Sequence, residues 1–203
     1  MEESYSHSGA LNTLALFPGV RSTVVVQALL DKVKILPRAA FTTRSPRREH
    51  LVPMKKIQLV TVHHSGFPNL WLEDDFDATA RNLEEIRALH CDPAGRNWAD
   101  IAYHYAVDRM GRVWQLRDLR FQGAHVRNHN ANNLGLVVLG NFDLQEPAPP
   151  QIDALFLLLK FIVRGYDLDG ICTHQQLADT PTSCPGLYLQ QILQRHADDF
   201  KKR

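Results

Sequence analysis

Short apolar runs of strand length alternate with longer helical patterns along most of this chain. In chain order, these strand-like and helical patterns occupy residues 57–64, 74–90, 100–117, 132–142, 149–168, 170–174 and 185–200. The third of them predicts two strands joined at the turn-like sequence DRMGR. Strands that alternate with helices, together with one hairpin, predict a single α/β domain in which helices flank a central mixed β-sheet.

The first 35 residues form an extension ahead of this pattern, and the domain itself is expected to span residues 36–203. Within the extension, periodicity leaves open whether residues 22–36 form a short helix or a strand with a helix. Residues 37–56 are basic and interrupted by prolines, which predicts an irregular surface segment. In the closing helix, the spacing of apolar residues predicts an inward face made of Leu187, Leu189, Ile192 and Leu193.

Composition excludes several classes of protein. The net charge of +1 implies no general attraction to nucleic acid or anionic lipid. The longest apolar run, residues 154–163, contains Lys160 and is shorter than the roughly 20 residues of a membrane span. Three cysteines argue against a disulfide framework, although a bridge between Cys91 and Cys172 stays open.

Two adjacent histidines, His63 and His64, stand where a predicted strand gives way to a loop. They could be a partly exposed pair, or one of them could hold a metal ion. Much later, His174 follows a short strand and Cys184 precedes a Pro-Gly turn. Imidazole and thiolate are preferred zinc ligands, and a catalytic zinc uses three protein ligands. Spacing alone leaves a second interpretation, in which His174 is an ordinary histidine and Cys184 a small buried apolar residue.

Four segments in order resemble the N-acetylmuramoyl-L-alanine amidases of the peptidoglycan recognition protein and phage-lysozyme type. They read VTVHHSG, DIAYHYAVDRMGRVWQLR, QGAHVRNHNANNLGLVVLGNFD and THQQLADTPTSCPGLYL. The similarity runs from about Pro37 to the final helix. The resemblance implies the fold of that family and a Zn²⁺ ion bound by His63, His174 and Cys184. Relatives that only bind commonly lack the cysteine, so the resemblance favours an enzyme.

The resemblance also implies two catalytic residues. Tyr103 matches the family's catalytic tyrosine, whereas composition alone would make it a core aromatic residue. Thr182 occupies a position where relatives carry lysine or threonine, and it would stabilise the oxyanion as a neutral donor. His104 is expected to face away from Tyr103 and to be structural, because side chains alternate along a strand. This chain has Val137 and Val138 where cytoplasmic muropeptide-recycling relatives carry a glutamate, so no carboxylate base is evident.

The loop at 122–133 resembles the loop that lines the family's substrate groove. The resemblance suggests five substrate-binding residues, which are His64, His125, Arg127, Asn130 and Asn133. His64 lies outside this loop and could line the groove or serve in packing. The alternative is a polar, solvated loop without a binding role. The basic run at 44–48 is expected to be solvated surface.

The expected function is zinc-dependent hydrolysis of the amide between N-acetylmuramic acid and L-alanine in peptidoglycan. The alternatives are a recognition module that binds peptidoglycan without cutting it and a protein with a structural zinc. The expected partner is peptidoglycan or a muropeptide, with no nucleic acid, no membrane span and a monomeric state. The start of the chain lacks the basic region of a secretory signal. We therefore expect a protein made in the cytoplasm that reaches the cell wall by phage release or non-classical export.

Overall fold

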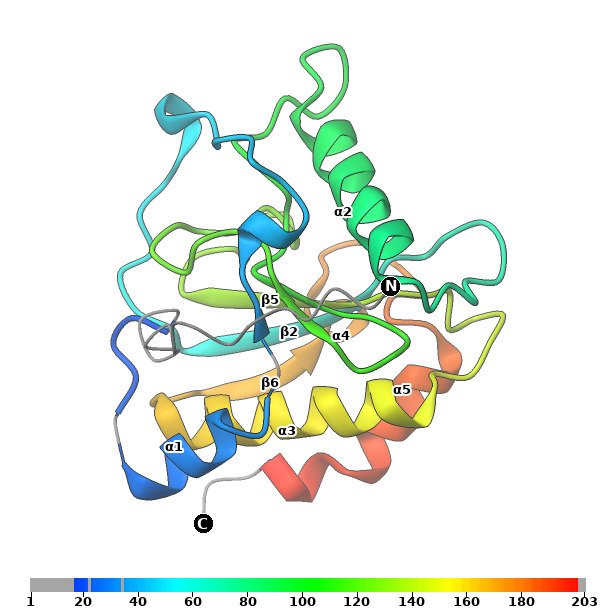
Figure 1. The fold of residues 1–203 in the computed structure, drawn as a ribbon. Coiled ribbons are helices and arrows are strands. Elements are labelled where there is room, and N and C mark those ends of the chain that lie inside the picture. Colours follow the sequence, from blue (N-terminus) through cyan, green and yellow to red (C-terminus); the bar gives the residue numbers. More distant parts are fainter. Residues whose placement is uncertain (1–16, 22, 34, 201–203) are drawn as a thin grey trace, which may run out of the picture.

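The computed structural model describes residues 17–21, 23–33 and 35–200, which build a six-stranded mixed sheet (Figure 1). Its strands are β1 (Ile35–Leu36), β2 (Leu59–His64), β3 (Tyr105–Val107), β4 (Val113–Gln115), β5 (Asn133–Val138) and β6 (Gly170–Thr173). They lie in the order β1-β4-β3-β5-β2-β6. Only β3 and β4 pair in the antiparallel sense, as the predicted hairpin, and the other neighbours are parallel. The predicted α/β domain with a mixed sheet is confirmed.

Helices cover both faces of this sheet. The α-helices are α1 (Val24–Leu30), α2 (Phe76–Cys91), α3 (Pro149–Gly165), α4 (His174–Leu177) and α5 (Leu187–Arg195), and the 3-10 turns are η2 (Arg38–Ala40), η3 (Arg48–His50) and η4 (Ala197–Phe200). Helix α2 lies on one face, whereas α1, α3 and α5 gather on the other (Figure 1). The side chain of Asp75 accepts the backbone N–H of Ala78 and caps the start of α2. No helix in the described part of the chain is long and apolar enough to cross a membrane.

The two faces of the sheet belong to separate hydrophobic clusters. Val60 and Val62 of β2 join the cluster that contains the buried residues of α3. On the other face, Val137 of β5 joins a smaller cluster with Leu83 of α2. Because successive side chains of a strand point to opposite faces, residues 61 and 63 face the α2 side. The alternation in β2 therefore decides which of its two histidines lies on which side.

The segment ahead of the domain packs against it. Periodicity left its structure open, and the segment forms a helix, α1, followed by the short strand β1. Helix α1 packs on α3, and the ring of Phe17 stacks on Tyr105 with 5.1 Å between ring centroids. Phe17 is 1% exposed. Residues 1–16 of the predicted extension lie outside the described residues.

One expectation about an individual side chain is wrong. Leu187 was expected to face inward but is 57% exposed, whereas Leu189 and Leu193 of the same helix are buried. Leu187 is the first residue of α5, so no earlier turn of this helix lies beneath its side chain. The bridge between Cys91 and Cys172, which composition left open, is absent, because both cysteines are free.

Candidate metal centre

The last two residues of β2 send their imidazoles to opposite sides of the sheet. His63 is 1% exposed and points toward the ring of Tyr103, with 5.1 Å between the ring centroids. His64 points the other way, and its Nδ1 accepts the backbone N–H of Phe142 at 3.2 Å. Of the two alternatives for His64, packing fits the structure, since the side chain is 8% exposed and bonded inside the protein.

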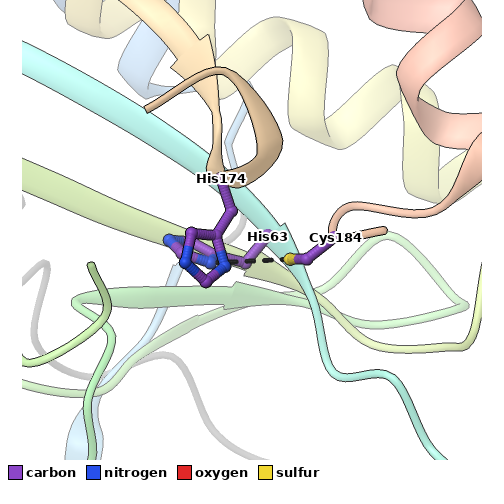
Figure 2. A group of neighbouring side chains, drawn as sticks. All are labelled: His63, His174 and Cys184. Carbon is purple, nitrogen blue, oxygen red and sulfur yellow. Dashed lines mark hydrogen bonds between the residues drawn. The ribbon is translucent and has the colours of Figure 1, made fainter. Parts of the chain in front are cut away.

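His63 meets two further metal-ligand side chains on its side of the sheet. The donor atoms of His63, His174 and Cys184 all lie within 4.8 Å of one another (Figure 2). His174 is the first residue of α4 and directly follows β6, which pairs in parallel with β2. Because the carboxyl ends of neighbouring parallel strands lie at the same edge of a sheet, the two histidines come together there. The predicted set of three ligands is therefore assembled in space.

Cys184 reaches the site from a loop, and backbone contacts hold it there. The N–H of Gln175 donates to the Cys184 carbonyl at 2.8 Å, which ties the cysteine to the turn that carries His174. The N–H of His64 donates to the Cys184 sulfur at 3.4 Å. Thr182 Oγ1 accepts the N–H of Cys184 at 3.2 Å. The loop that carries Cys184 is therefore held both by the turn at Gln175 and by the end of β2 at His64.

The spacing of the His63 and Cys184 donor atoms fits a zinc ion. The Nδ1 atom of His63 lies 3.6 Å from the sulfur of Cys184. Zn–S bonds of about 2.3 Å and Zn–N bonds of about 2.0–2.1 Å, set at a tetrahedral angle, put sulfur and nitrogen about 3.6 Å apart. Two imidazoles and one thiolate are also a donor set that zinc accepts in catalytic sites.

Burial sets the protonation of these donors. It lowers the pKa of His63 well below the ordinary value, helped by the neighbouring rings of His125 and His174. Burial also lowers the pKa of His174 and raises that of Cys184 to about 12. The imidazoles are therefore neutral, as metal ligands must be. A cation beside the sulfur would stabilise the thiolate that burial disfavours.

The two predicted catalytic residues lie beside this cluster. Tyr103 is half-buried. Its burial raises the pKa of its phenol above the ordinary value, and the charge of Cys184 adds a smaller rise. The phenol therefore keeps its proton at neutral pH and can act as a donor. Thr182 is half-buried. Its hydroxyl oxygen accepts from Cys184, and that bond does not use the hydroxyl proton.

The predicted groove residues are mostly engaged inside the protein. Asn133 is completely buried, its amide donates to the His129 carbonyl at 2.8 Å, and its side-chain oxygen accepts from Thr61 at 3.0 Å. The side-chain oxygen of Asn130 accepts the N–H groups of His125 and Val126. The side chain of Asn133 is therefore engaged by the protein itself, and the side-chain oxygen of Asn130 holds its own loop.

The other two predicted groove residues differ from each other. His125 is 7% exposed and lies against His63, with 3.0 Å between its Nδ1 and the Nε2 of His63. It faces the candidate metal ligand rather than solvent. Arg127 is exposed and is the predicted groove residue that stays available to a ligand.

His104 is structural, as expected. It is fully buried, its Nδ1 accepts the N–H of Gly135 at 2.9 Å, and its Nε2 lies 3.0 Å from the Phe121 carbonyl. Val137 and Val138 are packed in the core, so β5 supplies no carboxylate at the positions where one was sought.

One contact between two loops near the cysteine could not be predicted from the sequence. Asp179 accepts from Asn128 and lies 2.9 Å from the Nε2 of His129, which joins the loop at 122–133 to the loop that carries Cys184. An isolated aspartate in a polar loop carries no signal of its partner, so sequence reasoning could not find it.

Comparison with known proteins shows the family to which the chain is similar. A family model described as N-acetylmuramoyl-L-alanine amidase matches residues 53–187. Peptidoglycan-recognition protein SC2 of Drosophila melanogaster is 36% identical over 115 residues, which are 54% of this chain and 59% of that protein. An N-acetylmuramoyl-L-alanine amidase of Sus scrofa is 29% identical over 175 residues, which are 82% of this chain and 28% of that protein. The chain thus spans little more than half of the first relative and less than a third of the second.

Solved structures share the fold. The complex of tracheal cytotoxin with the ectodomains of peptidoglycan recognition proteins LCa and LCx has a chain that aligns with a TM-score of 0.69 and 27% identity. The alignment covers 79% of this chain and 95% of that one. The family model covers well over half of the sequence, and its match includes His63, His174 and Cys184. The chain therefore belongs to the N-acetylmuramoyl-L-alanine amidase family that includes the peptidoglycan recognition proteins.

Proposed function

We propose that this protein is a zinc-dependent amidase that cleaves the bond between N-acetylmuramic acid and L-alanine in peptidoglycan of the cell wall. The observation that carries the proposal is the convergence of His63, His174 and Cys184 with donor atoms within 4.8 Å. Three protein ligands are the number that catalytic zinc sites use, since the fourth position serves water or substrate.

The chemistry divides between the metal and the chain. A zinc ion held by these ligands supplies a water of lowered pKa and polarises the scissile carbonyl. The phenol of Tyr103, protonated at neutral pH, donates to the oxygen that becomes negative when the carbonyl is attacked. Thr182, whose oxygen fixes the Cys184 loop, adds a weaker neutral donor. Arg127, which is exposed in the loop at 122–133, would pair with a carboxylate of the stem peptide.

The substrate class follows from the family and from what its members bind. Tracheal cytotoxin is the ligand in the structure of the LCa and LCx ectodomains, and the related LE structure describes it as monomeric diaminopimelic acid-type peptidoglycan. We therefore propose peptidoglycan or a soluble muropeptide as the substrate of this chain.

The alternative function is recognition without cleavage, since the relatives include peptidoglycan recognition proteins and β5 supplies no carboxylate base at the buried Val137. The two functions differ in one product, a new amino terminus on L-alanine. Purified sacculi and a soluble muropeptide would be incubated with the zinc-loaded protein and with the Cys184→Ala variant, and free L-alanine termini and bound protein would be measured. Release by the wild type and not by the variant supports the amidase. Binding without release by the wild type contradicts it and identifies a recognition module.

A further inference from the structure

We propose that His125 is a positioning residue that fixes the tautomer and the ring orientation of His63, and that the affinity for the metal depends on it. The inference rests on the proposed function insofar as it takes His63 to be a metal ligand. It gives His125 a role that differs from contact with a sugar or a peptide.

The hydrogen bonds of His125 fix which of its nitrogens carries the proton. Its Nε2 lies 3.2 Å from the backbone carbonyl oxygen of Asn133, which has no hydrogen to give. The proton therefore resides on Nε2, and in a neutral ring Nδ1 must then be an acceptor. A doubly protonated His125 would be a buried cation with an imidazole and a carbonyl as its partners, which costs far more than the neutral form.

The tautomer of His63 follows from that of His125. Since Nδ1 of His125 accepts, the Nε2 of His63, 3.0 Å away, must donate its proton to it. The proton of neutral His63 is then on Nε2, and its Nδ1 carries a free lone pair. That same Nδ1 lies 3.6 Å from the sulfur of Cys184 and is the atom that would bind the metal. The opposite tautomer would place a proton where the metal must sit.

Two glycines create the space for the His125 ring. A Cβ atom at Gly135 would lie 2.5 Å from the Cδ2 atom of His125, and one at Gly123 would lie 2.4 Å from the same atom. Neither glycine has a positive φ angle, so close approach rather than backbone conformation calls for glycine there. The backbone N–H of His125 is bonded to the side chain of Asn130 at 2.8 Å. The ring is therefore confined on the sheet side and anchored through its backbone.

His125 has no ring nitrogen left for substrate. Its Nδ1 faces His63, its Nε2 faces the Asn133 carbonyl, and the residue is 7% exposed. It can act only through His63. Partners of this kind beside metal-bound histidines change metal affinity by about 10–100-fold when they are replaced.

A matched pair of variants separates this role from packing. His125→Asn keeps an acceptor oxygen near the position of Nδ1 and loses the bond to the Asn133 carbonyl. His125→Gln can keep a donor for that carbonyl and loses the acceptor toward His63. The dissociation constant for Zn²⁺ would be measured by competition with a chelator, without substrate, in proteins whose circular dichroism matches the wild type. We expect His125→Gln to bind zinc about 10–100-fold more weakly and His125→Asn to recover most of that loss. Equal affinities in the two variants would overturn the proposal.

A second measurement needs no substitution. Long-range ¹H–¹⁵N correlation spectra of the zinc-free wild type report which nitrogen of each histidine ring carries the proton. We expect Nε2–H for both His63 and His125, and Nδ1–H on His63 overturns the proposal. These outcomes are distinct from failure of the proposed function, because a wild type that releases no L-alanine termini could still show the expected tautomers. Conversely, an active zinc enzyme with the wrong tautomers would refute only the role of His125.

Discussion

The Nδ1 atom of His63 and the sulfur of Cys184 lie 3.6 Å apart although 121 positions separate the residues in the chain. The parallel pairing of β2 with β6 places His174 beside His63, and the bond from Gln175 to the Cys184 carbonyl draws the cysteine loop back to the same edge. The metal centre is therefore a product of the sheet topology, and the variants below test it one contact at a time.

The two adjacent histidines should respond differently to substitution. His63→Ala removes a metal ligand, so we expect loss of zinc and loss of hydrolysis. His64→Ala removes only the acceptor of the Phe142 N–H, so zinc and substantial activity should remain, with a cost in unfolding free energy of about 1–3 kcal/mol. Metal analysis, an assay for free L-alanine termini and urea denaturation measure the three quantities. Equal loss of zinc in both variants would show that the ligand is misassigned.

Tyr103 and Thr182 should differ in their weight in catalysis. Removal of one oxyanion donor costs about 10²–10³ in kcat in well-studied enzymes, and we expect Tyr103→Phe to fall in that range with zinc still bound. Thr182→Ala should cost less, because a neutral donor on a loop is replaceable by water. The kcat values of zinc-loaded variants decide the point. A greater loss for Thr182→Ala would reverse the ranking and give more weight to its bond with the Cys184 N–H.

Acid should weaken the metal-free protein through His104. Burial holds the pKa of His104 at about 4, below its ordinary value of 6.5, because the neutral ring is favoured in the folded state. The unfolded chain therefore takes up this proton first. The stabilisation is complete above about pH 6.5 and is lost as the pH falls toward 4, by up to about 1.4 kcal/mol per pH unit for one histidine.

Urea denaturation of the zinc-free protein at several pH values measures this slope. The His104→Asn variant lacks the titrating ring, so its unfolding free energy should fall less steeply over the same range, whatever its absolute stability. An unchanged slope in the variant would mean that other groups carry the acid sensitivity.

A methyl group at Gly135 should disturb the metal site without touching a ligand. The new Cβ would lie 2.5 Å from the ring of His125, so the ring must shift, and we expect weaker zinc binding together with a stability loss of about 1–3 kcal/mol. Gly170→Ala is the matched control on the edge strand β6, where a Cβ meets no atom within 4 Å. If the two variants bind zinc equally well, the fit of the His125 ring does not affect the metal site.

The architecture could be predicted from the sequence because strand and helix patterns are local. The strand pattern at residues 57–64 predicted β2, and the turn DRMGR predicted the hairpin of β3 and β4. The three metal ligands were identified through resemblance, since spacing alone left an ordinary histidine and a buried thiol as the alternative. Their spatial convergence is visible only in the structure.

The loop at 122–133 shows where sequence reasoning fails. His125 is a polar residue of this loop and Asn133 is the first residue of β5, and composition predicts exposure for polar residues of this kind. The fold buries both by pairing them with Thr61 and His63 of β2, which lie more than 60 positions earlier. The exposure of a polar loop residue depends on such distant partners, which the local sequence does not encode.

The most direct test of the central claim is the dependence of hydrolysis on bound zinc. The protein would be stripped with a chelator and titrated with Zn²⁺, and bound metal and new L-alanine amino termini would be measured at each step. We expect no release from the stripped protein and a rate that rises in proportion to bound zinc up to one ion per chain. Full activity without zinc, or one bound zinc per chain without any release from sacculi and soluble muropeptides, would contradict the assignment of His63, His174 and Cys184 as the ligands of a catalytic metal.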